Sequence, residues 1–334
     1  MNTLQDCLNE CSRIDTARAN CIAAMNSCGL TTPIDASLGM LPHYFGCDKY
    51  IGPSLSTKTN ASLDDANTAI SQVITKKNNL KNIINAFCAP KGISISDQGI
   101  DEYHSYIENV GATMLRVEYI SNPSKDDYID LGIPLDNSYI LSAKVRFPKG
   151  NLGNLYAPQS YQLFGSRSDT VIFGRTPIMG FTVYSINDPG EDLIRAAYYF
   201  PSGDYIEKSN ITLPAIIEFS DCKTVVTNTG TSFKKDLSGK IDGTNYTDSD
   251  LSPQDIPTIS TNCCIFNNTG KCPPNSRFYY AQIKNSSGTI IHNYLPYIIW
   301  GGCSWVPCVK DTVTNKFYYN SGPNTLNYGP IITE

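Results

Sequence analysis

The stretch Ser276-Arg-Phe-Tyr-Tyr-Ala-Gln-Ile-Lys-Asn-Ser-Ser-Gly-Thr289 decides the fold of the C-terminal part of the chain. Aromatic residues and isoleucine, which favour β-strands, dominate its first half. The Asn-Ser-Ser-Gly that follows is typical of a turn, and a return strand begins at Thr289. The stretch therefore predicts a β-hairpin.

Segments of the same kind precede this hairpin from about Gly111 onward, separated by turn signals such as Asn-Pro, Asp-Pro-Gly and Pro-Ser-Gly. We expect strands over residues 114–120, 139–145, 162–165, 181–186, 194–200, 215–219 and 278–284. Residues 227–260 are polar and rich in Gly, Ser, Thr and Asp, which predicts long surface loops with one or two edge strands. The pattern predicts an all-β jelly-roll sandwich over residues 111–334.

The first third of the chain has helical periodicity instead. One apolar stripe runs from Leu4 to Met25. A second stripe keeps alternating spacings of three and four for about three heptads, which is typical of a coiled-coil seam. It is interrupted by one polar residue, Lys77. The stripe fits either one amphipathic helix packed on its own domain or a contact between chains, and its regularity favours the second. We therefore predict an oligomerisation seam of Leu63, Ala66, Ile70, Val73, Leu80, Ile84 and Phe87.

Both helices lead into similar tails, each with an extended bridge and a short amphipathic helix. The same offset separates Leu38 from Ile100, Leu41 from Tyr103 and Phe45 from Ile107. This repetition predicts a duplicated helical module with halves of about 1–50 and 60–109. Together they form a predicted helical stem over residues 1–110. The predicted fold class is thus α+β and multidomain, with this stem followed by the jelly roll.

Composition limits the function classes. The 334 residues carry a net charge of −5 and only 17% charged residues, with no basic stripe that would suit nucleic acid. The N-terminus lacks the regions of a signal peptide, and no apolar run approaches a membrane span. We therefore expect a soluble protein made in a cytosol. In that compartment the 12 cysteines are expected to be reduced, buried thiols, with disulfides formed after lysis as the alternative.

Chemical motifs point away from catalysis. The cysteine spacings do not fit zinc knuckles, and the pairs Asp126–Asp127 and Asp248–Asp250 are interpreted as solvated turn carboxylates rather than calcium ligands. Glu191–Asp192 is the one acidic pair near strand ends, and it adjoins an Asp-Pro-Gly turn. We expect no enzyme activity, no cofactor and no metal. Stacking platforms for glycans would come from Tyr198, Tyr199, Tyr205, Trp300, Trp305 and Tyr319.

A resemblance adds to these expectations. The hairpin at Ser276–Thr289 is followed by Tyr294-Leu-Pro296 and by an Asp-x-x-x-x-x-Phe-Tyr-x-Asn pattern from Asp311 to Asn320. This end resembles that of concanavalin-like (laminin-G-like) lectin domains in phage tail and fibre proteins. Tyr128–Leu135 and Tyr161–Arg167 look like that family's opening strand and next core strand, while residues 220–275 depart from it. Among phage proteins, the mixture of features looks most like fibres of crAss-like phages.

The resemblance implies a homotrimeric fibre subunit on the virion surface, made in the host cytoplasm. Its partners would be two further copies, other capsid or tail proteins and, through the lectin-like part, host surface polysaccharide. A head fibre is favoured. A tail fibre or receptor-binding protein and a purely structural collar or decoration protein are the alternatives, followed by a glycan-degrading tailspike.

Overall fold

A computed structural model describes residues 4–47, 63–95, 99–148, 160–167, 177–185, 193–252, 256–257, 259, 261–266 and 272–332. The chain divides into two compact units. The first, here called the helical unit, contains Met1–Leu115, Ile298–Val306 and Thr333–Glu334. The second, here called the β-rich unit, contains Arg116–Tyr297 and Pro307–Ile332. The predicted boundary lay at residues 110/111 and assigned the segment 298–306 to the β-sandwich.

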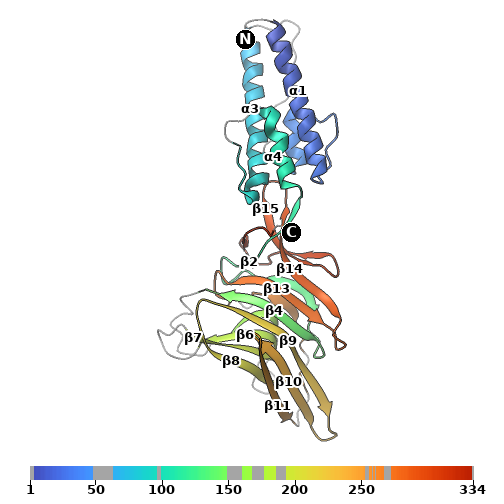
Figure 1. The fold of residues 1–334 in the computed structure, drawn as a ribbon, viewed down its shortest axis with the longest axis vertical. Coiled ribbons are helices and arrows are strands. Elements are labelled where there is room, and N and C mark those ends of the chain that lie inside the picture. The colour runs from blue at the N-terminus through green and yellow to red at the C-terminus, as the bar shows by residue number, and fades with distance from the viewer. Residues whose placement is uncertain are drawn as a thin grey trace. The chain divides into compact units, whose positions relative to one another are not determined.

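The helical unit is built on two long helices and a shorter one. The last helix, α4, packs against both α1 and α3, whereas α2 and the short 3-10 helix η1 pack against α3 (Figure 1). Both long helices occur where the apolar periodicity predicts them. The helices are α1 (Leu4–Ser27), η1 (Leu38–Met40), α2 (Leu41–Tyr44), α3 (Leu63–Cys88), η3 (Ala89–Lys91), η4 (Ile100–Glu102) and α4 (Tyr103–Val110).

Equivalent contacts hold the chain where it leaves each long helix. Asn26 donates through Nδ2 to Thr32 O at 2.9 Å and accepts from Thr32 N at 2.7 Å. Asn85 makes the same reciprocal pair with Ile95, at 3.2 and 2.6 Å. Each asparagine thus supplies the donor and acceptor that a neighbouring strand would otherwise provide, and fixes the extended bridge beside the helix end.

The segment Ile298–Val306 is held in the helical unit by aromatic side chains. The Trp300 indole donates to Phe45 O at 2.7 Å, and the Trp305 indole donates to Phe87 O at 3.0 Å. The rings of Phe87 and Trp305 stack with centroids 5.6 Å apart, and Trp300 meets Phe87 edge-on at 5.1 Å. Burying a polar indole N–H requires such a partner, so these bonds fix the position of the segment.

A disulfide and two glycines in close backbone contact also hold the segment Ile298–Val306 in the helical unit. Cys47 and Cys303 are disulfide-bonded, with their Cα atoms 4.9 Å apart. Next to them, a Cβ on Gly302, whose φ is +98°, would lie 2.2 Å from Gly46 O. Only glycine tolerates both this conformation and this approach of two backbones.

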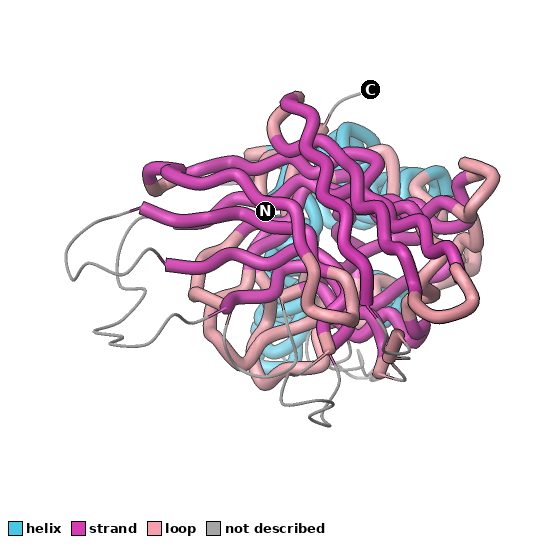
Figure 2. The backbone as a smooth tube through the Cα atoms, turned by 90° about the horizontal axis from the view of Figure 1, so that it is seen from below, coloured by secondary structure: helices cyan, strands magenta, loops and turns pink. Residues whose placement is uncertain are grey.

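The β-rich unit consists of two sheets of antiparallel strands. The larger sheet has the order β11-β10-β9-β4-β13-β14-β15-β16, with β1, β2 and β17 attached, and the smaller has the order β3-β12-β5-β6-β7-β8. Figure 2 shows these strands in magenta. Their bounds are β1 (Met114–Arg116), β2 (Ile120–Ser121), β3 (Ile129–Pro134), β4 (Ile140–Phe147), β5 (Ser160–Arg167), β6 (Ile178–Ser185), β7 (Leu193–Tyr199), β8 (Tyr205–Thr212), β9 (Ala215–Asn228), β10 (Phe233–Ile241), β11 (Thr244–Ser252), β12 (Asn262–Ile265), β13 (Arg277–Lys284), β14 (Ile290–Trp300), β15 (Trp305–Asp311), β16 (Lys316–Tyr318) and β17 (Asn327–Tyr328).

Apolar side chains from the two sheets meet in a common core. Phe181 of β6 stacks on Phe219 of β9 with centroids 4.3 Å apart, and both rings are fully buried. At one end of the core, buried Lys235 of β10 forms an ion pair with Asp204 in the β7–β8 turn, and its Nζ lies 3.4 Å from Asp250. The predicted combination of helices with a β-sandwich is therefore correct at this level.

The prediction for residues 227–260 was partly correct: the region contains an edge strand, β11, but its described residues form strands rather than mainly long loops. This region contains the end of β9 and all of β10 and β11, which form one side of the larger sheet. Its polar composition misled because β11 is an edge strand, where few side chains need to be apolar. On β10, the buried positions Leu237 and Ile241 still show the alternation of a strand.

No helix in the described part of the chain has both the length and the apolar character needed to cross a membrane.

Candidate functional site

The predicted seam lies on α3, but the structure divides it. Leu80, Ile84 and Phe87 are fully buried within a single chain, because α2, η1 and α4 pack against α3. These three side chains therefore cannot form a seam between chains while the helical unit stays folded. The side chains of Leu63 and Ala66 lie outside the described residues.

The other two seam residues remain accessible. Ile70 is 46% exposed and Val73 is half-buried, and the neighbouring Ile74, which was not in the predicted seam, is 53% exposed. Spacings of three and four place these three side chains on one face of the helix. We call Ile70, Val73 and Ile74 the α3 apolar surface. It contains two residues of the predicted seam, Ile70 and Val73, together with Ile74.

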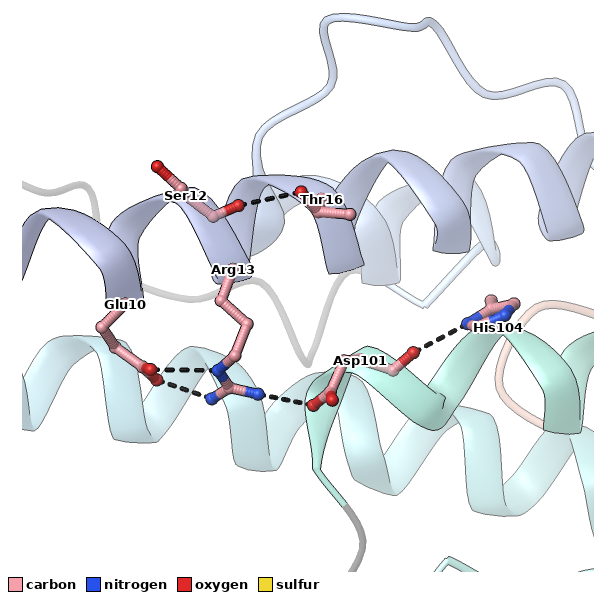
Figure 3. Close-up of polar contacts among 6 residues, drawn as sticks. All are labelled: Glu10, Ser12, Arg13, Thr16, Asp101 and His104. Carbon is pink, nitrogen blue, oxygen red and sulfur yellow. Dashed lines mark hydrogen bonds and ion pairs between the residues drawn. The ribbon is translucent and has the colours of Figure 1, made fainter.

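An exposed ion network links α1 to η4 (Figure 3). Arg13 donates to both carboxylate oxygens of Glu10, at 2.9 and 2.6 Å, and to Asp101 Oδ1 at 2.5 Å. Hydrogen bonding to Glu10 is the main cause that raises the pKa of Arg13, and the same bond lowers the pKa of Glu10. His104 Nδ1 lies 2.8 Å from Asp101 O. At this exposure the pairs contribute about 0–1 kcal/mol each, so their effect is to orient the elements.

Asp311, the first residue of the Asp-x-x-x-x-x-Phe-Tyr-x-Asn motif, holds a turn in place. It is fully buried and accepts hydrogen bonds from His292 Nδ1 at 2.7 Å, Thr314 Oγ1 at 2.6 Å, Asn293 N at 3.0 Å and Val313 N at 3.1 Å. Burial by itself raises its pKa, but these bonds, that of His292 first, outweigh burial and lower the pKa. Asp311 and His292 are therefore engaged in holding the β15–β16 turn against β14.

The asparagine that closes the motif binds a second buried carboxylate. Asn320 donates to Asp127 at 2.9 Å, and Asn324 donates to the same carboxylate through N and Nδ2, at 3.0 and 3.1 Å. Burial raises the pKa of Asp127, but these bonds outweigh it and lower the pKa. The interpretation of Asp127 as a solvated turn carboxylate was wrong. Asp127 ties the start of β3 to the C-terminal segment instead.

The cysteines are mostly buried thiols, as predicted. Burial raises the pKa of Cys21, Cys88, Cys222, Cys272 and Cys308 to about 12. Cys11 is exposed, and Cys47 and Cys303 contradict the prediction because they form the disulfide. No group of three His, Cys, Asp or Glu side chains among the described residues is close enough to hold a metal ion.

The aromatic candidates for glycan stacking separate by exposure. Tyr198, Trp300 and Trp305 are buried and cannot stack on a ligand from solvent. Tyr205 is 40% exposed and stacks on Tyr199 with centroids 4.9 Å apart, while Tyr319 is 48% exposed. Among the described candidates, the tyrosine pair at the β7–β8 turn and Tyr319 are thus accessible from solvent, and the stacked pair offers the larger aromatic surface.

An open pocket of about 380 Å³ lies in the β-rich unit between the start of β4 and the last part of β9. The apolar side chains of Ile140, Val225 and Val226 contribute to its lining beside polar groups. Asp136 is engaged by Ser138, which donates to it through N at 2.8 Å and Oγ at 2.6 Å and lowers its pKa. The lining comprises Asp136, Asn137, Ser138, Ile140, Lys223, Thr224, Val225, Val226 and Ser286.

The acidic pair Glu191–Asp192 lies outside the described residues, as does the side chain of one of the cysteines, Cys7. Comparison with known protein families and with curated proteins gives no match to the chain.

Proposed function

We propose that the chain is a non-enzymatic structural subunit of a phage virion fibre, with a head fibre favoured over a tail fibre or a collar protein. The helical unit acts as stem and docking region for other capsid or tail proteins. The β-rich unit is the jelly-roll, lectin-like part displayed on the virion surface. Two observations support this division: the chain has one helical and one β-rich unit, and two sheets share a core in the latter.

The proposed stem rests on a duplicated module. In support, η1 and η4 start at Leu38 and Ile100, the positions related by the offset seen in the sequence. The reciprocal hydrogen-bond pairs that Asn26 and Asn85 make with the chain after each long helix occur in the same order in the two halves. The tail of each half also packs on the long helix of the other, because η1 and α2 contact α3 while η4 and α4 contact α1.

The α3 apolar surface is the observation that carries the proposal. Two large aliphatic side chains one turn apart, Ile70 at 46% and Ile74 at 53% exposure, are unfavourable in water unless another surface covers them. Two further copies of the chain cover them in the proposed homotrimer. Three weak sites for host polysaccharide on one stem would then gain avidity without any new contact.

Light scattering on the full chain tests this association. We expect a trimer for the native sequence and a monomer for the double variant Ile70→Lys/Ile74→Lys, because lysine at both positions places charges in the contact. The matched control is Ile34→Lys, which changes an 85% exposed isoleucine in the helical unit but outside α3 and should stay trimeric. A native chain that is monomeric at all accessible concentrations would contradict the proposal.

Attachment to glycans is tested separately on the tyrosine pair. We expect the purified chain to bind host capsular polysaccharide weakly and Tyr205→Ala to lose most of that binding, whereas Val313→Ala, also on an exposed site, keeps it. A native chain that binds no host polysaccharide would favour a collar or decoration protein. Degradation of the capsule by the chain would instead support the tailspike alternative, and imaging the chain in intact particles distinguishes head from tail.

A further inference from the structure

Strand β9 is longer than its neighbour. Its pairing with β4 ends where Leu141 lies opposite Cys222, whereas its pairing with β10 continues to Asn228 opposite Phe233. Residues 223–228 therefore have a paired strand on one side only within the described sheet. In this stretch every second residue directs its backbone N–H and C=O away from β10. We call residues 223–228 the β9 edge.

The path along which β4 would continue is taken by a self-contained turn. Tyr139 N donates to Asp136 O at 3.0 Å, and the Asp136 carboxylate is bound by Ser138. On the other side of β4, β13 ends with Lys284 opposite Ile140. The turn therefore directs its hydrogen bonds inward, and the open pocket lies along the β9 edge in place of a strand.

The side chains of the β9 edge suit an added strand. Val225 is 51% exposed and Val226 is 36% exposed, and neighbours in a strand point to opposite faces of the sheet. Thr224, which shares the face of Val226, is buried, and its Oγ1 lies 3.4 Å from the Tyr198 hydroxyl. Edge strands are commonly protected by charged side chains, yet two adjacent β-branched apolar residues occur here. A strand placed beside them would cover one valine on each face.

Charge and shape indicate which class of molecule can bind at the β9 edge. The Lys223 ammonium has no ion-pair or hydrogen-bond partner among the described residues, whereas Asp136 is satisfied by Ser138. The residues lining the pocket include no aromatic side chain on which a sugar ring could stack. Unpaired backbone groups, two exposed valines and a free cation together match an extended peptide better than a saccharide.

We propose that the β9 edge binds an extended peptide segment of a partner protein, which adds to the larger sheet as a further strand. The segment carries apolar side chains that cover Val225 and Val226 and an acidic side chain that pairs with Lys223. Backbone hydrogen bonds supply the affinity, and the alternating side chains supply the specificity.

Fluorescence polarisation with labelled synthetic heptapeptides on the full chain tests this proposal. The first probe is Thr-Val-Thr-Val-Asp-Val-Thr, the second has Lys in place of Asp, and the third has Pro in place of the central Val. We expect the acidic peptide to bind roughly three- to tenfold more tightly than the lysine peptide. The proline peptide should not bind, because proline removes a donor that the added strand needs.

Charge reversal on the protein gives the decisive comparison. Lys223→Glu should invert the preference so that the lysine peptide binds more tightly. Val225→Lys should abolish binding of both peptides, while Val313→Lys, also at a 51% exposed valine, serves as the matched control and changes neither affinity. Circular dichroism of each variant verifies that the sheet is retained.

Each of the following binding results would overturn the proposal: no binding of either peptide, equal binding of the proline peptide, a preference unchanged by Lys223→Glu, or binding of a saccharide that Lys223→Glu abolishes. Concentration-dependent pairing of two copies that Val225→Lys abolishes would assign the β9 edge to self-association and also overturn it.

Discussion

Removing the Cys47–Cys303 disulfide should destabilise the helical unit in particular. The bond joins residues separated by 256 positions, and for a loop of that length chain entropy gives about 5–6 kcal/mol. If the β-rich unit remains folded while the helical unit opens, the flexible part of the loop shrinks to roughly 70 residues and the effect to about 4 kcal/mol. We therefore expect Cys303→Ser to lower the free energy of unfolding of the helical unit by about 2–5 kcal/mol.

Tryptophan fluorescence measures this unit alone. The chain has 2 tryptophans, and Trp300 and Trp305 both lie in the segment that the helical unit holds. Urea unfolding followed by their emission should show an earlier midpoint for Cys303→Ser, and the native chain treated with reductant should give the same curve. The two indole hydrogen bonds remain in the variant, so its emission before unfolding should match that of the native chain.

Cys11→Ser is the matched control, because Cys11 is an exposed free thiol. Its midpoint should equal that of the native chain in both redox states. If mass spectrometry verifies the disulfide and its removal still leaves the midpoint unchanged, the segment is held by the aromatic contacts alone and the entropic argument fails.

Three further predictions concern single residues. Because the folded chain lowers the pKa of Asp127 and of Asp311, both carboxylates stabilise the β-rich unit above their unfolded pKa of about 4, and this stability is lost as the pH falls through their folded pKa values. Near-ultraviolet circular dichroism across an acid titration should show the loss, and Asp127→Asn should make the stability less dependent on pH. Asp127→Asn should also cost about 2–4 kcal/mol at neutral pH, because one carboxylate oxygen becomes an NH2 group that cannot accept its share of the bonds from Asn320, Asn324 and Ser124 N, and an unchanged thermal midpoint would argue against this role. Gly302→Ala should lower the midpoint of the tryptophan transition, since its Cβ would lie 2.2 Å from Gly46 O, whereas Gly92→Ala, with positive φ but open space, should cost only about 1 kcal/mol. Lys235→Met should cost about 3–5 kcal/mol by leaving the Asp204 carboxylate without its cation, and a variant with the thermal midpoint of the native chain would argue against this contribution.

Local periodicity was enough to predict the two long helices and the C-terminal hairpin but not the surfaces on which they pack. The spacing from Leu63 to Phe87 located α3, and the hairpin at Ser276 located β13 and β14. The same spacing could not tell whether Leu80, Ile84 and Phe87 face their own chain or another, because either contact gives an identical pattern. The structure resolves this through α4 and α2, whose packing depends on residues far along the chain.

The candidate sites were less predictable for the same reason. Cys47 and Cys303 carry no sequence signal of pairing, since many connectivities are compatible with 12 cysteines. The β9 edge was hidden because the sequence predicted this strand only over residues 215–219, whereas the strand continues to Asn228. Strand β10 could have been predicted from the even spacing of Lys235, Leu237 and Ile241, whose side chains are buried on one face of the strand.

Because the segment Ile298–Val306 belongs to the helical unit, this unit cannot be completed in the order of synthesis. Leu115 and Ile298 are separated by Arg116–Tyr297 of the β-rich unit, so at synthesis rates of about 5–20 residues per second the helices wait roughly 10–40 s for their last segment. During that interval Phe45 and Phe87 lack the indoles that cover them. The helical unit therefore stays incomplete, with these aromatic side chains uncovered, until most of the β-rich unit has been synthesised.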